Sequence, residues 1–181
     1  MLNLAVTLDG FIEGPNGEID WCNFEDNPGA ESFFEKFLPT IGSIFYGRIS
    51  YDLWGQYQPD ESASASEKKL WASVHSMEKY VFSRKPRNDN KAIFIKDDII
   101  TAVNDIKSKP GKDIWLYGGA NLITEFINLG LVDFYQLAVF PVILGSGKPL
   151  FSNIKNRVGL QLINVETSAS GVILLNYNAN S

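Results

Sequence analysis

The chain has 181 residues, 45% of them hydrophobic and 20% charged, and this much apolar side chain can bury a sizeable core. The formal charge of −5 excludes an extended nucleic-acid-binding face, because such a face is strongly positive. The single cysteine (Cys22) and the single histidine (His75) exclude an internal disulfide and a structural zinc site, and they argue against hydrolases of the Ser-His-Asp or Cys-His type. No signal-peptide pattern or membrane-length apolar run is present, so we expect one cytoplasmic domain over residues 1–181 that binds neither membrane nor nucleic acid.

The first half of the chain alternates short apolar runs with amphipathic stretches, which is typical of an α/β fold. Apolar residues alternate from Leu2 to Leu8, and Gly and Pro mark a turn directly afterwards. Asn27 can cap a helix, and Pro39 can end it. In chain order, we expect a strand over 2–8, a helix over 27–38, a strand over 43–46, a short helix near 50–55 and a helix over 67–74.

The second half continues the alternation and adds a terminal hairpin. An acidic residue at 97 or 98 marks a helix start, and Pro110 ends that helix. A turn at Ser170 and Gly171 joins the last two strands in an antiparallel pair. We expect strands over 79–83 and 92–95, a helix over 98–108, a strand over 114–117, a helix over 120–128, and strands over 132–144, 160–166 and 171–177. The whole pattern predicts a mostly parallel central sheet of about eight strands with flanking helices.

Three stretches at strand ends carry groups that suit an anionic ligand. Gly118 and Gly119 stand between a strand and a helix, where backbone can approach a ligand closely and free N–H groups attract a phosphate. Arg48 and Ser50 follow another strand and open a short helix. Taken alone, each pattern is more typical of an ordinary turn or a capped surface helix.

The third stretch is basic. Ser83, Arg84 and Lys85 follow the strand over 79–83, and Arg87 is close behind. Clustered cations on an acidic protein favour a locally steered anion, although a solvated basic loop has the same composition. Because all three stretches follow strands, together they are a more specific signal than any one of them.

Five short motifs then stand in a distinctive order. They are T-L-D-G over 7–10, G-R-I-S-Y over 47–51, V-F-S-R over 81–84, L-Y-G-G over 116–119 and L-G-S-G-K-P-L-F over 144–151. In this order they resemble the dihydrofolate-reductase-like superfamily. The Leu-Asp-Gly start and the last motif look more like the reductase domain of the bifunctional riboflavin-biosynthesis deaminase-reductase. The resemblance covers about residues 2–177.

The resemblance implies a three-layer α/β fold that binds NADPH. Arg48 and Ser50 would contact cofactor phosphates, Ser83 and Arg84 would hold the adenosine 2′-phosphate, and the glycine pair would hold the pyrophosphate. The implied cofactor-binding residues are Ala5, Gly47, Arg48, Ser50, Ser83, Arg84, Gly118, Gly119, Ala120 and Asn121. The implied substrate-side residues are Asp9, Trp21, Phe34 and Tyr117.

The proton source is a separate question, because hydride transfer to a C=N or C=O bond also needs a proton. Dihydrofolate reductases use a carboxylate on the first helix, and a gapless count back from Gly47 places Glu31 there. Asp26 fits a different alignment. Both residues can instead be helix-start acids favoured by the helix dipole, and the riboflavin-type branch need not use such an acid.

The expected activity is an NADPH-dependent reduction of a small pterin-like or ribosylaminopyrimidine substrate, as in 5-amino-6-(5-phosphoribosylamino)uracil reductase. A deaminase domain is not expected, since its His and Cys zinc ligands are missing. The alternatives are a true dihydrofolate reductase, which the motif over 144–151 disfavours, and a non-catalytic NADP(H)-binding module. The run over 132–144 and the terminal hairpin offer an edge for a homodimer, which resembles the habit of the family.

Overall fold

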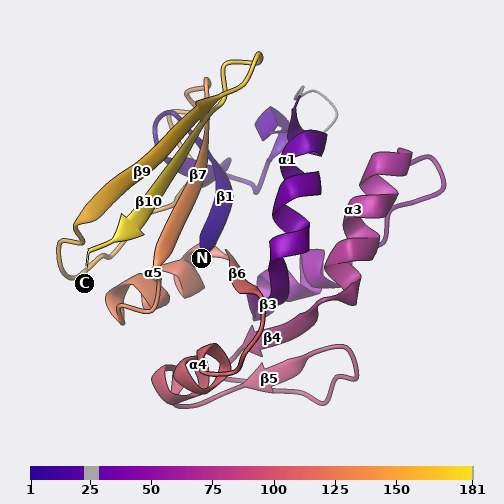
Figure 1. The fold of residues 1–181 in the computed structure, drawn as a ribbon, viewed down its shortest axis with the longest axis vertical. Coiled ribbons are helices and arrows are strands. Elements are labelled where there is room, and N and C mark those ends of the chain that lie inside the picture. Colours follow the sequence, from indigo (N-terminus) through magenta and orange to yellow (C-terminus); the bar gives the residue numbers. More distant parts are fainter. Residues whose placement is uncertain (23–28, 181) are drawn as a thin grey trace. The chain divides into compact units, whose positions relative to one another are not determined.

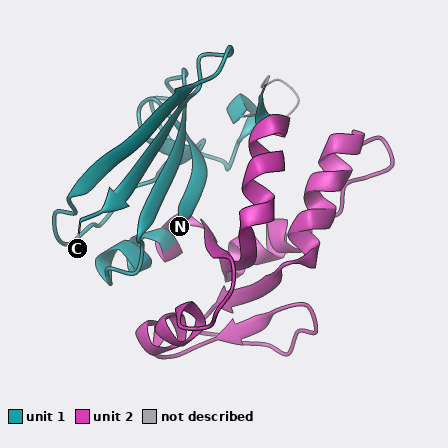
Figure 2. Ribbon diagram, in the orientation of Figure 1, with its two compact units in different colours: residues 1–30, 123–181 teal, residues 31–122 magenta. Residues whose placement is uncertain are grey.

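The computed structural model describes residues 1–22 and 29–180, and its contacts divide the chain into two compact units. Unit 1 holds residues 1–30 and 123–181, and unit 2 holds residues 31–122 (Figure 2). The expectation of one domain over the whole chain stays a prediction. Asp26, which was predicted as a possible proton donor, lies outside the described residues.

Unit 2 contains four parallel strands in the order β5-β4-β3-β6. Figure 1 shows α1 and α3 on one face of these strands and α4 on the other, which makes three layers. The strands are β3 (Ile41–Gly47), β4 (Glu78–Phe82), β5 (Ile93–Ile95) and β6 (Asp113–Gly118). The helices are α1 (Ala30–Phe37), α2 (Arg48–Ser50), α3 (Ala65–Ser76) and α4 (Ile99–Lys107), with short turns η2 (Leu38–Thr40) and η3 (Tyr51–Gly55).

Local signals explain where two of these helices begin. The Ser64 hydroxyl accepts a hydrogen bond from the Glu67 backbone N–H at 3.1 Å and caps α3, which begins at Ala65, two residues before the expected start. The Asp98 carboxylate caps α4 by accepting from the Thr101 N–H at 3.1 Å. The helix near 50–55 starts at residue 48 and continues as a π-helical turn over Tyr51–Gly55.

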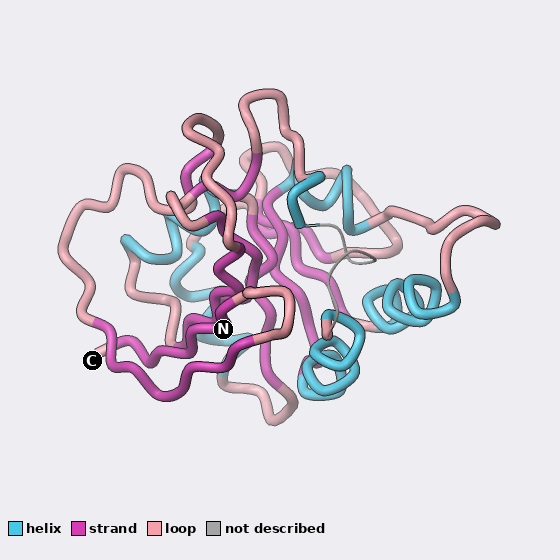
Figure 3. The backbone as a smooth tube through the Cα atoms, turned by 90° about the horizontal axis from the view of Figure 1, so that it is seen from above, coloured by secondary structure: helices cyan, strands magenta, loops and turns pink. Residues whose placement is uncertain are grey.

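Unit 1 contains the order β1-β7-β10-β9, in which β1 and β7 are parallel and the last two pairings are antiparallel. Figure 3 shows the C-terminal pair β9 and β10 side by side. The strands are β1 (Leu2–Thr7), β7 (Phe134–Phe140), β9 (Leu160–Thr167) and β10 (Ile173–Ala179). A small ribbon joins β2 (Phe11–Glu13) to β8 (Lys148–Pro149), a turn η1 covers Asp20–Cys22, and α5 (Ala120–Asn128) has its last six residues in this unit.

Each unit has its own buried core. In unit 2, Ile44, Tyr46, Tyr51, Val81 and Val103 are fully buried. In unit 1, Leu2, Ile123, Phe126 and Leu150 are buried to a similar degree. These cores hold the strand ends of each unit in place.

The predicted strand over 132–144 is wrong in length. The strand β7 begins at Phe134 and ends at Phe140, before Pro141, which has no N–H to donate to a neighbouring strand. The Val142 N–H instead turns back to the Phe140 carbonyl at 2.8 Å. The ribbon of β2 and β8 was not predicted, because two very short strands in glycine-rich loops leave no periodic pattern.

The predicted fold class is confirmed: the chain has an α/β fold in which eight strands (β1, β3–β7, β9 and β10) pair mostly in parallel, with an antiparallel C-terminal pair. Among residues 1–22 and 29–180, no helix has the length and apolar character needed to cross a membrane.

Candidate functional site

Three parallel strands of unit 2 end at one edge of the sheet. Gly47 at the end of β3 is in register with Phe82 at the end of β4, and Tyr46 is in register with Gly118 at the end of β6. The residues that follow these strands therefore lie at one edge, as parallel pairing requires. The structure thus brings together the three stretches that the sequence singled out.

The closest approach at this edge is between Ser50 and Gly119. A Cβ built on Gly119 would lie 3.0 Å from Ser50 Oγ, and one built on Gly47 would lie 3.5 Å from the Gly118 carbonyl oxygen. Gly118 has φ +113°, which favours glycine, and the Gly118–Gly119 peptide bond is cis. Because the glycines have no side chains, their backbone lies open beside the Ser50 hydroxyl. This arrangement fits a phosphate group.

The helix α5 starts directly after this glycine pair. The Leu122 N–H donates to the Gly119 carbonyl at 2.9 Å, which closes the first turn. Ala120 is buried and Asn121 is exposed, so Asn121 is the side chain of this turn that solvent reaches. The dipole of α5 favours negative charge at this end.

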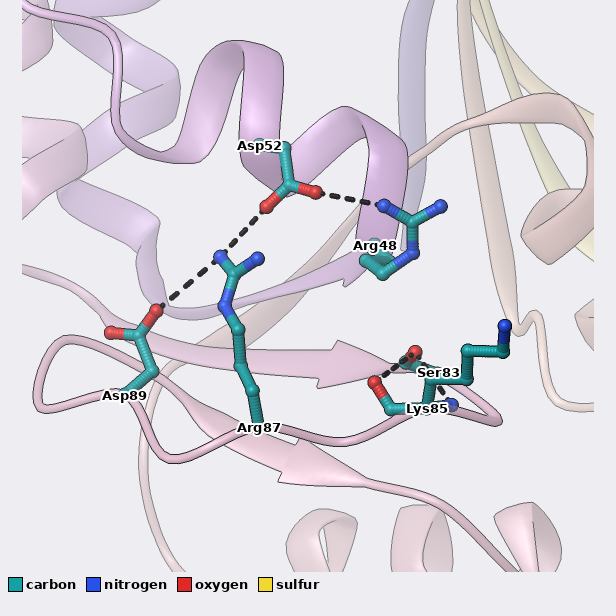
Figure 4. A network of polar contacts seen from close by, with 6 residues as sticks. All are labelled: Arg48, Asp52, Ser83, Lys85, Arg87 and Asp89. Atoms are coloured by element: carbon teal, nitrogen blue, oxygen red, sulfur yellow. Dashed lines mark hydrogen bonds and ion pairs between the residues drawn. The ribbon is translucent and has the colours of Figure 1, made fainter.

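A charged network joins Arg48, Asp52, Arg87 and Asp89 (Figure 4). Arg48 Nη1 is 3.0 Å from Asp52 Oδ2, and Arg87 Nη2 is 2.7 Å from Asp52 Oδ1. The pKa of Arg87 is raised, first by its hydrogen bond to Asp52. Asp52 was not predicted, although its position four residues after Arg48 on a helical segment is the spacing of an ion pair.

Ser83 forms hydrogen bonds within the protein, whereas Arg84 is open to solvent. The Ser83 hydroxyl accepts from the Lys85 N–H at 3.1 Å and donates to the Lys85 carbonyl at 3.0 Å, so it forms a turn at the exit of β4. Arg84 is exposed, and in the described part of the chain it forms no ion pair. Arg84 thus presents a guanidinium group that a phosphate can reach.

Asp9 is occupied within unit 1. Its carboxylate accepts from the Thr7 hydroxyl at 2.6 Å and from the Gly145 N–H at 2.7 Å, and more weakly from the Leu144 N–H at 3.3 Å. These bonds, the Thr7 bond foremost, lower the pKa of Asp9. Two of the predicted motifs are therefore fastened to each other through Asp9, and its expected contact with substrate stays a prediction.

Two further residues of unit 1 were expected near nicotinamide and substrate. Ala5 is half-buried in the middle of β1, paired in register with Ala138. The Trp21 ring packs edge-on against Phe140 at 5.4 Å between centroids. Trp21 Nε1 is a buried donor with no hydrogen-bond partner among the described residues, so it is suited to a ligand acceptor.

An aromatic row in unit 2 includes the predicted residues Phe34 and Tyr117. The Tyr117 ring lies 5.1 Å from Trp115 and 4.9 Å from Tyr46. Phe34 packs edge-on against Phe33 at 5.2 Å on α1. Burial raises the pKa of Tyr46, so its hydroxyl keeps its proton. Both Phe34 and Tyr117 remain partly exposed, as contact with a planar ligand requires.

Glu31 lies at an exposed position in the first turn of α1. Its Oε1 accepts a hydrogen bond from the Ser66 hydroxyl of α3 at 2.5 Å. Glu31 therefore lies where the alternative interpretation placed it, as an exposed acidic residue at the start of a helix. A catalytic role for Glu31 stays a prediction.

Known proteins share the fold and the sequence pattern. The uncharacterized protein YyaP of Bacillus subtilis (strain 168) is 56% identical over 181 residues, covering 99% of this chain and 94% of that protein. A putative riboflavin biosynthesis protein from Shewanella sp. PV-4 has a similar structure, with a TM-score of 0.79, 20% identity and coverage of 99% and 98%. Dihydrofolate reductase from Enterococcus faecalis, solved with NADP(H), gives a TM-score of 0.67 at 15% identity, with coverage of 99% and 95%.

These sequence and structural similarities agree with a match to one protein family. The model of the RibD C-terminal domain matches residues 1–174, nearly the whole chain. The resemblance read from the five motifs is thereby confirmed. The chain belongs to the RibD C-terminal domain family, a riboflavin-pathway reductase-like family.

Proposed function

We propose that the protein is an NADPH-dependent reductase that transfers a hydride to a small planar heterocycle or ribosylaminopyrimidine. The observation that carries the proposal is the edge of unit 2 where Ser50 Oγ faces Gly119 and where Arg48 follows the neighbouring strand. Membership of the RibD C-terminal domain family supports the reductase class.

The residues at this edge have separate tasks in the proposal. The backbone of Gly118 and Gly119, with the first turn of α5, would hold the pyrophosphate. Arg48 and the exposed Arg84 would bind the 2′-phosphate of NADPH by charge-assisted hydrogen bonds. When bound, the reduced nicotinamide supplies the hydride.

Trp21 of unit 1 is a separate candidate for a substrate contact. The unpartnered Nε1–H of Trp21 would donate to a substrate carbonyl or ring nitrogen. The loop between β1 and β2 is fixed by Asp9 and Thr7, so its backbone keeps one shape. The proton for the accepting atom would come from Glu31, from Asp26 or from solvent.

A specific observation favours a second candidate, a module that binds NADP(H) without turnover. The carboxylates of Asp9 and Glu31 are both hydrogen-bonded to other parts of the chain. Each carboxylate would have to leave these partners before it could donate a proton. A true dihydrofolate reductase has less support, because it depends on such an acid.

Turnover separates these candidates. The purified protein is mixed with NADPH and either 5-amino-6-(5-phosphoribosylamino)uracil or dihydrofolate, and loss of reduced-nicotinamide absorbance is followed. Mass spectrometry then looks for a product that has gained two hydrogen atoms. The proposal expects reduction of the aminouracil. Binding of NADPH with no loss of absorbance with either compound would favour the module, and reduction of dihydrofolate alone would favour the third candidate.

A further inference from the structure

One carboxylate joins two arginines that come from two different strand ends. Arg48 opens the helix after β3, and Arg87 lies in the connector over 84–91 that follows β4. Asp52 uses Oδ2 for Arg48 and Oδ1 for Arg87, at 3.0 and 2.7 Å (Figure 4). Asp52 thus links the segment after β3 to the connector after β4, and these two segments carry the basic residues.

Arg87 is held by several groups, although 42% of its side chain is exposed. Besides Asp52, its Nη2 is 3.5 Å from Asp89 Oδ2. Its guanidinium carbon lies 5.2 Å from the ring centre of Phe94 and 5.7 Å from that of Tyr51. Two carboxylates and two rings balance this cation, so Arg87 anchors the connector and is not the group offered to a ligand.

Arg48 is held differently. One amino group of its guanidinium contacts Asp52, and Figure 4 shows the other directed away from Asp52. In the same view the Lys85 side chain extends toward the side of the network where Arg48 lies and away from Asp89. Lys85 and Arg84 stand at the near end of the connector that Arg87 anchors. Their charges have no partner carboxylate in this network.

The charges of the network can be counted. Arg48 and Arg87 carry two positive charges, and Asp52 and Asp89 carry two negative charges, so these four groups sum to zero. Arg84 and Lys85 then provide the uncompensated positive charge at this edge. A dinucleotide with an additional 2′-phosphate would bind more tightly than one without it only if Arg84 and Lys85 keep their positions.

We propose that Asp52 is the positioning residue that sets the preference for a 2′-phosphorylated dinucleotide over its unphosphorylated form. This inference rests on the proposed function. Asp52 acts through Arg48 on one side and, through Arg87, on the connector that carries Arg84 and Lys85 on the other. The pyrophosphate contacts proposed for Gly118 and Gly119 would be the same for both dinucleotides and would not pass through Asp52.

Asp52→Asn tests the inference with almost no change of shape. An amide has one acceptor atom and one donor group, so it can satisfy only one of the two arginines and faces the other with a donor. The lost negative charge would by itself favour a phosphate, but this attraction is about 1 kcal/mol or less in water and is screened by salt. We therefore expect loss of positioning to dominate.

The experiment measures dissociation constants of NADPH and NADH by calorimetry at fixed salt, for four proteins. Asp52→Asn should weaken NADPH about tenfold and leave NADH within about twofold. Asp52→Glu keeps two acceptor oxygens and should restore most of the preference. Asp97→Asn makes the same change of net charge at an exposed carboxylate outside the network and should keep the wild-type ratio.

The outcomes separate this inference from the proposed function. If the wild type prefers NADPH and Asp52→Asn keeps that ratio, or tightens NADPH, the inference fails alone. An equal loss for both dinucleotides with a lowered melting temperature assigns Asp52 a merely structural role and also overturns it. A wild type that binds neither dinucleotide overturns the proposed function, and the inference with it.

Discussion

Ser50 and Gly119 meet at the edge of unit 2, where Ser50 Oγ would be 3.0 Å from any Cβ placed on residue 119. The two residues belong to separate motifs, one after β3 and one after β6. A side chain at 119 would therefore press on the Ser50 hydroxyl, which would have to move by a few tenths of an ångström. This contact is the structural core of the proposed phosphate site.

Gly119→Ala should weaken the binding of NADPH and NADH alike, by about tenfold, because the added methyl group displaces Ser50 or the backbone that would hold the pyrophosphate. Gly111→Ala is the matched control, since a Cβ there meets open space. Fluorescence titration of both dinucleotides gives the comparison. Wild-type affinity in Gly119→Ala would remove the glycine pair from the site.

Arg84→Ala should weaken NADPH more than NADH. One charge-assisted hydrogen bond to the 2′-phosphate contributes about 1.5–3 kcal/mol, and NADH has no such phosphate. Arg157→Ala, which removes an exposed arginine of unit 1, should change neither affinity. Calorimetry on the three proteins checks this, and an equal loss for both dinucleotides with Arg84→Ala would contradict the role given to Arg84.

Asp9→Asn should lower the free energy of unfolding at neutral pH. Hydrogen bonds from Thr7 and the 144–145 backbone lower the pKa of Asp9 below its ordinary value of 3.8. A group with a lowered folded-state pKa stabilises the fold above its unfolded pKa, and this stabilisation disappears as the pH falls through the folded pKa. The difference from wild type should therefore shrink below about pH 4.

Urea unfolding of wild type and Asp9→Asn across this range gives the measurement. Asp97→Asn serves as the control, because that carboxylate is exposed and 3.8 Å from Lys96. A difference between Asp9→Asn and wild type that stays constant down to the lowest pH would show that ionisation of Asp9 is not the cause.

The outer strand of unit 1 leads us to propose a homodimer. All eight residues of β9 are exposed, including Leu162 at 53% and Ile163 at 52%. Such an edge offers unpaired backbone groups and apolar surface to a second copy. Sedimentation velocity should detect a dimer for the wild type and a monomer for Ile163→Lys.

The control for the dimer is Ile143→Lys, which places the same charge at an exposed apolar residue of the same unit outside its strands. It should sediment like the wild type. A wild type that remains monomeric at every concentration tested would end this proposal.

Much of the candidate site could be predicted from sequence, because it depends on where strands end. Strand β3 and the short helix after it place Arg48 and Ser50 from local signals alone, and Gly118 with Gly119 marks the exit of β6. Parallel pairing then brings these exits to one edge without knowledge of any side-chain contact.

Long-range pairings could not be predicted. The bond from Arg87 to Asp52 joins residues 35 positions apart, and the bond from Gly145 to Asp9 joins residues 136 apart. Local sequence patterns do not show which of the many acidic residues forms an ion pair with a given arginine. The bonds of Asp9 to the 144–145 backbone were therefore not predicted, while the substrate contact that the family resemblance implied for Asp9 stays a prediction.

The most direct test of the account is a titration of the wild-type protein with NADPH and with NADH under the same conditions. The proposed site, with Arg48 and Arg84 beside the Ser50–Gly119 contact, predicts saturable binding of both, with NADPH bound at least about tenfold more tightly. No binding, or equal affinity for the two dinucleotides, would contradict it.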